Sequence, residues 1–215
     1  MTDLNHLPPE LSGEDMPHAV RLVRGYFDPV ALWPHFGGAH FERLDGGGDR
    51  QEVRNQITGS DIVAVGLLSV DIPKDAVQDL KGASAEISRL LKDIPYDVDL
   101  ADADVSLISP DSSAWELWEL LVGVNGVGWV TANKLLARKR PRLLPVYDNV
   151  VRDFLGEPDG YWGELRTALQ RDDRALYKRL LDIRDRADVG DDISPLRVFD
   201  VICWRLGMKY IAPGE

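Results

Sequence analysis

The sequence is organised around Gly126-Val127-Gly128, where two glycines and a valine join two stretches of helical periodicity. The first stretch begins with Ser113 and Glu116, which form the S-x-x-E pattern of a helix capping box. Pro141 requires the second helix to end before it. Apolar residues recur at helical spacing in both stretches: Trp115, Trp118, Leu121 and Val122 in the first, and Ala132, Leu135 and Leu136 in the second. Residues 114–140 are therefore predicted to form a helical hairpin.

An isolated acid, Asp148, follows the hairpin after a short extended segment, residues 143–147. Aspartate is a preferred residue immediately before the first turn of a helix, because its side chain accepts a hydrogen bond from an otherwise unpaired backbone N–H. The residues after Asp148 suit a short helix that ends at Gly156. Asp148 is therefore expected to start that helix.

Together, GVGWVTANKLLA and the later PVYDNVV resemble the signature of the endonuclease III and AlkA superfamily of DNA glycosylases. In that superfamily a Leu-Pro-Gly-hydrophobic-Gly hairpin is followed, two residues later, by Thr-Ala. A catalytic aspartate then comes after a short proline-containing strand. The matching positions in this chain are Gly126, Val127, Gly128, Thr131, Ala132 and Asp148. Beyond residues 114–156 the likeness is only a general all-helical one.

The resemblance implies an all-α, two-lobed helical fold in which Asp148 is catalytic and the N-glycosidic bond of a modified or damaged base is hydrolysed. The chain departs from the usual pattern at Val124-Asn125, which replace Leu-Pro, and at Asn149, which replaces a frequent Thr. Val130 stands where bifunctional members carry a Schiff-base lysine, so base release without strand nicking is expected. A single cysteine, Cys203, excludes the four-cysteine iron–sulfur cluster of many relatives, and no cofactor is expected.

The chemistry of glycosidic hydrolysis suits a carboxylate at Asp148. The sugar gains positive charge as the base departs, and a carboxylate stabilises that charge and orients the attacking water. The plainer role of Asp148 is a helix cap, and the two roles coexist in the resembled family. A base extruded from DNA would enter a pocket between the lobes. Trp129, Tyr147 and Asn149 are candidates for lining that pocket, although the two aromatic residues also suit a hydrophobic core.

The distribution of charge bears on nucleic-acid binding. The net charge of −11 opposes indiscriminate binding to phosphates. Residues 126–152, however, contain six cations and one acid, a local net charge of +5 that we call the basic island. With the hairpin amides, it is expected to contact DNA through Gly126, Val127, Gly128, Thr131, Lys134, Arg138, Lys139, Arg140 and Arg142. Alternatively, residues 138–142 form a solvated helix C-terminus, where cations interact favourably with the helix dipole.

Three functions remain open from the sequence. The leading hypothesis is a monofunctional DNA glycosylase-like enzyme with DNA as its partner. The second is a non-catalytic helix-hairpin-helix module that binds nucleic acid or a protein. The third is a hydrolase of a free modified nucleoside, which the low overall positive charge suits better than duplex DNA.

Outside the hairpin, residues 1–17 are expected to be a flexible tail and residues 18–215 a single helical domain of two lobes. Residues 62–70 are apolar on nearly every side, which suits a buried helix or a buried strand. Ser60-Asp61 and the resemblance favour the helix. Further helices are expected at 74–81 and 83–92, around Trp162 to Leu169, around Leu176 to Ile183, and from Ser194-Pro195 to Leu206.

No membrane segment or metal site is expected. The longest apolar runs fall short of the roughly eighteen residues of a membrane span, and the N-terminus is too acidic for a signal peptide, which suggests the cytoplasm. The histidines are His6, His18, His35 and His40, and their spacing matches no metal-ligand pattern. The acidic residues at 97–104 could hold calcium or magnesium, but they lack the glycine and terminal glutamate of an EF-hand. A solvated acidic connector is favoured there.

Overall fold

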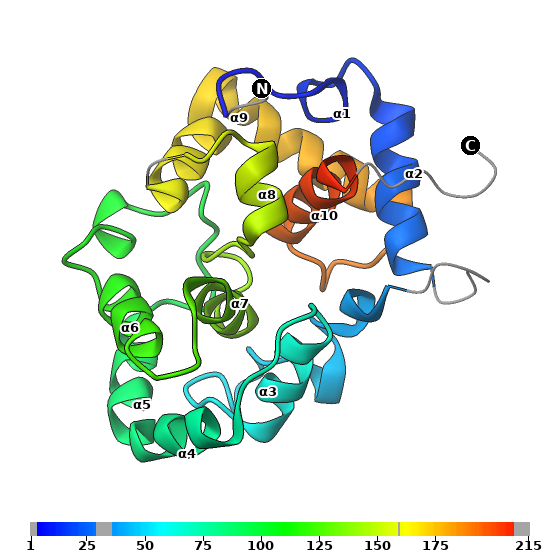
Figure 1. Cartoon of the computed structure of the whole chain (residues 1–215). Coiled ribbons are helices and arrows are strands. Elements are labelled where there is room, and N and C mark those ends of the chain that lie inside the picture. The colour runs from blue at the N-terminus through cyan, green and yellow to red at the C-terminus, as the bar shows by residue number, and fades with distance from the viewer. Residues whose placement is uncertain (1–3, 29–35, 159, 209–215) are drawn as a thin grey trace. The chain divides into compact units, whose positions relative to one another are not determined.

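The computed structural model describes residues 4–28, 36–158 and 160–208. Helices connected by turns make up these residues, and no β-strand occurs among them (Figure 1). The prediction of an all-α fold is confirmed. His35 lies outside the described residues. No helix in the described part of the chain is long and apolar enough to cross a membrane.

The chain folds into two compact units. Unit 1 combines the two ends of the chain, Met1–Ala39 and Tyr147–Glu215, whereas unit 2 is the continuous middle segment, His40–Val146. The predicted hairpin therefore belongs to unit 2 and Asp148 to unit 1.

Unit 2 is built around the second helix of the hairpin. Its α-helices are α3 (Gly59–Gly66), α4 (Lys74–Gly82), α5 (Ser84–Asp93), α6 (Ser113–Val122) and α7 (Trp129–Lys139). Two short 3-10 helices, η2 (Leu44–Gly46) and η3 (Val105–Leu107), lie in its connections. Helix α7 packs against α3 and α6, and residues 131–140 are all buried. A helix that is buried on every side is the centre of its unit.

Helix α3 shows why the apolar segment after residue 58 is helical. Thr58 and Asp61 form a reciprocal capping box, in which the Thr58 side chain accepts from Asp61 N and the Asp61 side chain accepts from Thr58 N. These two bonds satisfy backbone donors that a helix start otherwise leaves unpaired. The predicted helix is confirmed, although it ends at Gly66.

Unit 1 is built around the last helix of the chain. It contains α1 (Pro9–Ser12), α2 (Met16–Phe27), α8 (Asn149–Phe154), α9 (Tyr161–Ala187) and α10 (Pro195–Gly207), while the 3-10 helix η1 spans Gly37–His40 at its border with unit 2. Helix α10 packs against α1, α2, α8 and α9 (Figure 1). As predicted, Ser194 caps α10 by accepting from Arg197 N, and Pro195 occupies the first turn.

Helix α9 is interrupted where the sequence predicts two separate helices. Residues 171–174 leave the helical conformation, and Asp172, Asp173 and Arg174 have positive φ angles of 50°, 54° and 64°. Left-handed conformations are unfavourable for residues with a Cβ atom, and three in succession are rare. The helical segments on either side carry the two predicted apolar faces.

The described part of the N-terminal segment, residues 4–17, is not a loose tail. Leu4 and Leu11 are buried, and α1 packs against α2, α9 and α10. The prediction of a flexible tail at 1–17 is wrong for these residues, because two leucines among polar neighbours are enough to anchor the segment on the core of unit 1.

Candidate functional site

The first helix of the hairpin differs from its predicted form in its cap and in its buried face. Its N-cap is Ser112, whose Oγ accepts from Trp115 N at 3.1 Å, and not Ser113. The buried side chains are Ala114, Leu117 and Leu121. Trp115 and Trp118 are half-buried and lie against each other with ring centroids 5.2 Å apart. A pair of tryptophans can cover apolar surface at the edge of a hydrophobic core. The helical spacing of Trp115 and Trp118 therefore does not by itself identify the buried face of α6.

The turn between α6 and α7 has the backbone geometry expected of the glycine pattern. Gly126 has φ of +90°, and a Cβ atom there would lie 2.9 Å from Pro73 Cγ, so both conformation and space require glycine. Val127 is buried and anchors the turn, while Gly126 and Gly128 are exposed. Gly128 is the N-cap of α7, and no described side chain caps this helix. The start of α7 therefore presents backbone donors to the surface, a geometry that suits an anion.

Four cations of the basic island are buried in the interior of unit 2. Lys134, Arg138, Lys139 and Arg140 are between 1% and 3% exposed. Lys134 Nζ donates to Leu68 O at 2.8 Å. Burial lowers the pKa of Lys139, against the opposing effect of Asp61. The prediction that these four side chains contact phosphate is wrong for the folded protein, because their donors are used inside it.

Asp61 is the anionic partner of two of these cations. Arg138 Nε lies 3.2 Å from Asp61 Oδ1, and Lys139 Nζ lies 3.0 Å from Asp61 Oδ2. Arg138 also donates to three backbone carbonyls in the segment before α3, those of Phe41, Glu42 and Leu44. Those carbonyls lie outside α-helices, so a side-chain donor satisfies them.

Arg140 uses all five of its guanidinium donors inside the protein. The acceptors are the carbonyl oxygens of Ile94, Arg54, Lys139 and Leu91 and the Oδ1 atom of Asn55. Burial, with a smaller contribution from the charge of Arg54, lowers the pKa of Arg140 to about 10. Arg140 thus ties two separate segments of unit 2, residues 54–55 and 91–94, to the end of α7.

The remaining residues of the predicted nucleic-acid surface, and the last cation of the basic island, differ in their exposure to solvent. Thr131 is buried. Arg142 is exposed and binds Asp99 through two bonds of 3.0 and 2.7 Å. Asp99 is itself buried, so the acidic connector is not solvated at this position. Arg152 is half-buried and pairs with Asp153 at 2.8 Å. The described cations therefore do not form a continuous exposed basic island.

Asp148 caps α8 as predicted. Its Oδ1 atom accepts from Val151 N at 3.1 Å, and the residue is half-buried. Asn149, the first residue of α8, is exposed beside it. Trp129, the third pocket candidate, is half-buried in the first turn of α7 and belongs to unit 2. Unit 1 therefore contains Tyr147, Asp148 and Asn149.

Tyr147, the residue before Asp148, is one of a pair of stacked tyrosines. The rings of Tyr147 and Tyr161 are 3.8 Å apart at their centroids and 12° from parallel. Burial raises the pKa of Tyr147 to about 12. Burial also raises the pKa of Tyr161 well above its ordinary value, and the charges of Cys203, Asp200, Tyr147 and Asp148 act in the same direction. Both phenols are therefore neutral hydrogen-bond donors at neutral pH.

The hydroxyl of Tyr161 is buried and has no hydrogen-bond partner among the described residues. Buried polar groups are nearly always satisfied, so the exception at Tyr161 makes its hydroxyl a candidate functional group. Sequence reasoning missed Tyr161, because it lies thirteen positions after Asp148 and only the tertiary structure stacks its ring on Tyr147.

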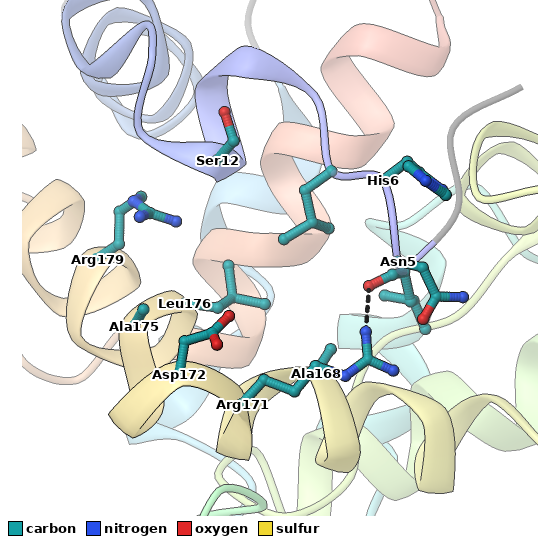
Figure 2. A pocket seen from close by; sticks show the side chains of 11 residues that line it. Asn5, His6, Ser12, Ala168, Arg171, Asp172, Ala175, Leu176 and Arg179 are labelled. Carbon is teal, nitrogen blue, oxygen red and sulfur yellow. Dashed lines mark hydrogen bonds between the residues drawn. The ribbon is translucent and has the colours of Figure 1, made fainter.

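Unit 1 also contains a cavity of about 330 Å³ between the N-terminal segment and the interruption of α9 (Figure 2). Arg171 and Arg179 line it, and Arg171 Nη1 donates to Leu4 O at 3.4 Å. None of the site residues predicted from the sequence is among its described lining residues. The cavity therefore does not support the chemistry expected of Asp148.

Comparison with known proteins identifies one family. The model of a family of unknown function (DUF6308) matches residues 19–207. No curated protein and no solved structure matches the chain.

Proposed function

The chain belongs to the DUF6308 family of unknown function, and from its own residues we propose that it hydrolyses the N-glycosidic bond of a modified or damaged base, with Asp148 as the catalytic carboxylate. The release is monofunctional, because Val130 offers no amine at the position of the Schiff-base lysine.

The observation that carries the proposal is the environment of Asp148. One carboxylate oxygen is held by the cap bond to Val151 N, and the residue is half-buried, so its carboxylate is oriented and still partly exposed to solvent. The ring of Tyr161 stacks on that of Tyr147, the residue before Asp148, and its hydroxyl is a buried donor without a partner among the described residues. An oriented carboxylate stabilises the positive charge that develops on the sugar, and a nearby neutral donor can orient the attacking water.

DNA is the proposed source of the base, and the hairpin supports it. The exposed turn at Gly126 to Gly128 and the start of α7 offer backbone donors of the kind that bind a phosphate without a cationic side chain. Arg142 is the exposed cation nearest to this helix in sequence. Because the hairpin would bind through backbone donors and the cations of α7 are buried, DNA binding through it should depend only weakly on salt.

A free modified nucleoside is the second candidate substrate. The burial of Lys134, Arg138, Lys139 and Arg140 favours it, because a nucleoside carries no phosphate and needs no basic surface. The proposed chemistry at Asp148 is the same for both substrates.

The test is a screen for base release. Duplex and single-stranded oligonucleotides that each carry one modified base are compared with the corresponding free nucleosides, and the released base is measured by chromatography and mass spectrometry. On the substrate found, Asp148→Asn should reduce the rate by ~10² or more, because it removes the charge that stabilises the transition state. Its melting temperature should be unchanged, because Asn caps a helix about as well as Asp.

Asp153→Asn is the matched control, since Asp153 is exposed on the same helix and should leave the rate unchanged. If Asp148→Asn keeps most of the rate, Asp148 is only a helix cap and the proposal fails. DNA binding without release of any base in the screen would instead identify a non-catalytic helix-hairpin-helix module.

A further inference from the structure

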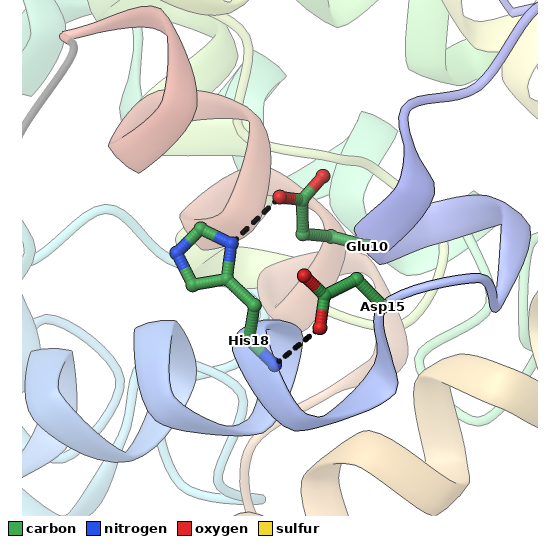
Figure 3. A group of neighbouring side chains, drawn as sticks. All are labelled: Glu10, Asp15 and His18. Carbon is green, nitrogen blue, oxygen red and sulfur yellow. Dashed lines mark hydrogen bonds and ion pairs between the residues drawn. The ribbon is translucent and has the colours of Figure 1, made fainter.

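Three potential metal ligands meet at the junction of α1 and α2 in unit 1, and the proposed hydrolase does not use them. They are Glu10 on α1, Asp15 before α2 and His18 in the first turn of α2 (Figure 3). One ligand atom from each residue lies within 4.8 Å of the other two. The sequence pattern E-x₄-D-x₂-H matches no familiar metal motif, so the sequence does not predict this cluster, and only the structure shows that the three residues lie close together.

The three side chains are oriented by the structure around them. His18 Nδ1 lies 2.7 Å from Glu10 Oε1, and Asp15 Oδ1 accepts from His18 N at 3.1 Å as the cap of α2. The chain reverses between α1 and α2 at Gly13, whose φ of +97° favours glycine. This reversal directs the Glu10 carboxylate back toward the start of α2, as Figure 3 shows.

The charge and burial of the cluster favour a cation. The Glu10 side chain is only 10% exposed, and the Asp15 carboxylate lies close to it. Two carboxylates around a single imidazole repel each other, and a buried carboxylate is costly unless a positive partner compensates it. A divalent ion neutralises both carboxylates at once.

We propose that Glu10, Asp15 and His18 bind one divalent transition-metal ion, for which zinc is the best match. An imidazole ligand selects transition metals over Mg²⁺ and Ca²⁺, and zinc accepts nitrogen and carboxylate oxygen together. Small side-chain rotations bring the three ligand atoms to the roughly 2.0–2.2 Å that zinc requires. The ion takes Nδ1 of His18, so the imidazole proton resides on Nε2. A water molecule completes a four-coordinate site with three protein ligands.

The test is a titration of the full-length protein with Zn²⁺ after removal of metals by chelation, followed by calorimetry and thermal unfolding. The wild type should bind one zinc ion saturably and melt at a higher temperature with zinc, because an ion that binds only the folded state stabilises it. His18→Ala and Asp15→Asn should each weaken zinc binding by ~10-fold or more. Mg²⁺ should not replace zinc.

Asp15→Asn separates the ligand from the helix cap, because Asn preserves the cap bond. Its melting temperature without zinc should equal that of the wild type, so weakened binding cannot come from misfolding. His40→Ala is the matched control, since His40 is an exposed histidine outside the cluster and its loss should leave zinc binding unchanged. The absence of saturable binding, or equal binding by His18→Ala or Asp15→Asn, overturns the proposal. Equal binding of Mg²⁺ overturns the assignment to a transition metal.

Discussion

The end of α7 in unit 2 and the start of α8 in unit 1 both carry charged residues to which the sequence assigns a function. The two sites differ in how fully their polar groups are paired inside the protein. At α7, each of the five donors of Arg140 has an internal acceptor, and Asp61 compensates Arg138 and Lys139. At α8, Asp148 is half-buried, and Tyr161, which stacks on the preceding Tyr147, has a hydroxyl without a partner among the described residues. A completed set of partners indicates a structural role, whereas an incomplete set indicates a candidate site.

Substitutions at these two sites should also differ in their effect on the free energy of unfolding. Taking a charge out of water is costly, and removing one member of a completed buried network leaves the others unpaired. Substitutions at the end of α7 should therefore act on stability. Substitutions around Asp148 that preserve its cap bond should act on activity with little effect on stability.

The largest effect is expected for Arg140→Lys. A lysine offers three donors in place of five and cannot reproduce the planar arrangement, so at least two buried acceptors lose their bonds. The free energy of unfolding, measured by urea denaturation, should fall by ~3 kcal/mol or more. Arg142→Lys is the matched control two residues away, where the exposed side chain keeps its charge opposite Asp99 and should cost less than ~1 kcal/mol. Equal losses for the two variants would remove the distinction between the buried network and the surface.

An intermediate effect is expected for Asp148→Ala. Alanine removes the acceptor of the bond from Val151 N, so the free energy of unfolding should fall by ~1 kcal/mol, whereas Asp148→Asn should leave it unchanged. Urea denaturation of both variants measures the difference. Destabilisation by Asp148→Asn as large as that by Asp148→Ala would mean that the negative charge itself supports the fold, which would move Asp148 into the same class as Asp61.

The smallest effect on stability is expected for Tyr161→Phe. Its hydroxyl makes no bond in the described structure, so its removal should change the free energy of unfolding by less than ~0.5 kcal/mol. Tyr26→Phe is the contrasting variant in the same unit, because it loses a buried bond of 2.8 Å from Arg197 and should cost ~1.5 kcal/mol or more. A loss at Tyr161 as large as that at Tyr26 would show that the hydroxyl already has a structural partner. On a substrate found by the screen, Tyr161→Phe should reduce base release several-fold.

The elements that the sequence predicts well depend on nearby residues. Apolar periodicity and Ser194-Pro195 place α10, and the backbone preference of glycine places the turn at Gly126. The errors concern which face of an element is buried. Trp115 and Trp118 occupy a helical stripe, yet the neighbouring stripe with Leu117 is the inner one. Two adjacent apolar stripes satisfy the same periodicity, and only the packing partners distinguish them.

The sequence by itself determined that the chain is all-helical, where the hairpin turns, and that Asp148 starts a helix, because each of these depends on interactions within a few residues. The tertiary structure alone decided that the cations of α7 are interior, because their acceptors come from segments at residues 41–44, 54–55, 61, 68 and 91–94. It also decided that Tyr161 stacks on Tyr147 and that its hydroxyl is buried without a partner among the described residues. Charge is a property of a residue, but its exposure and its partners are properties of the fold, and they determine whether it binds a ligand or holds the protein together.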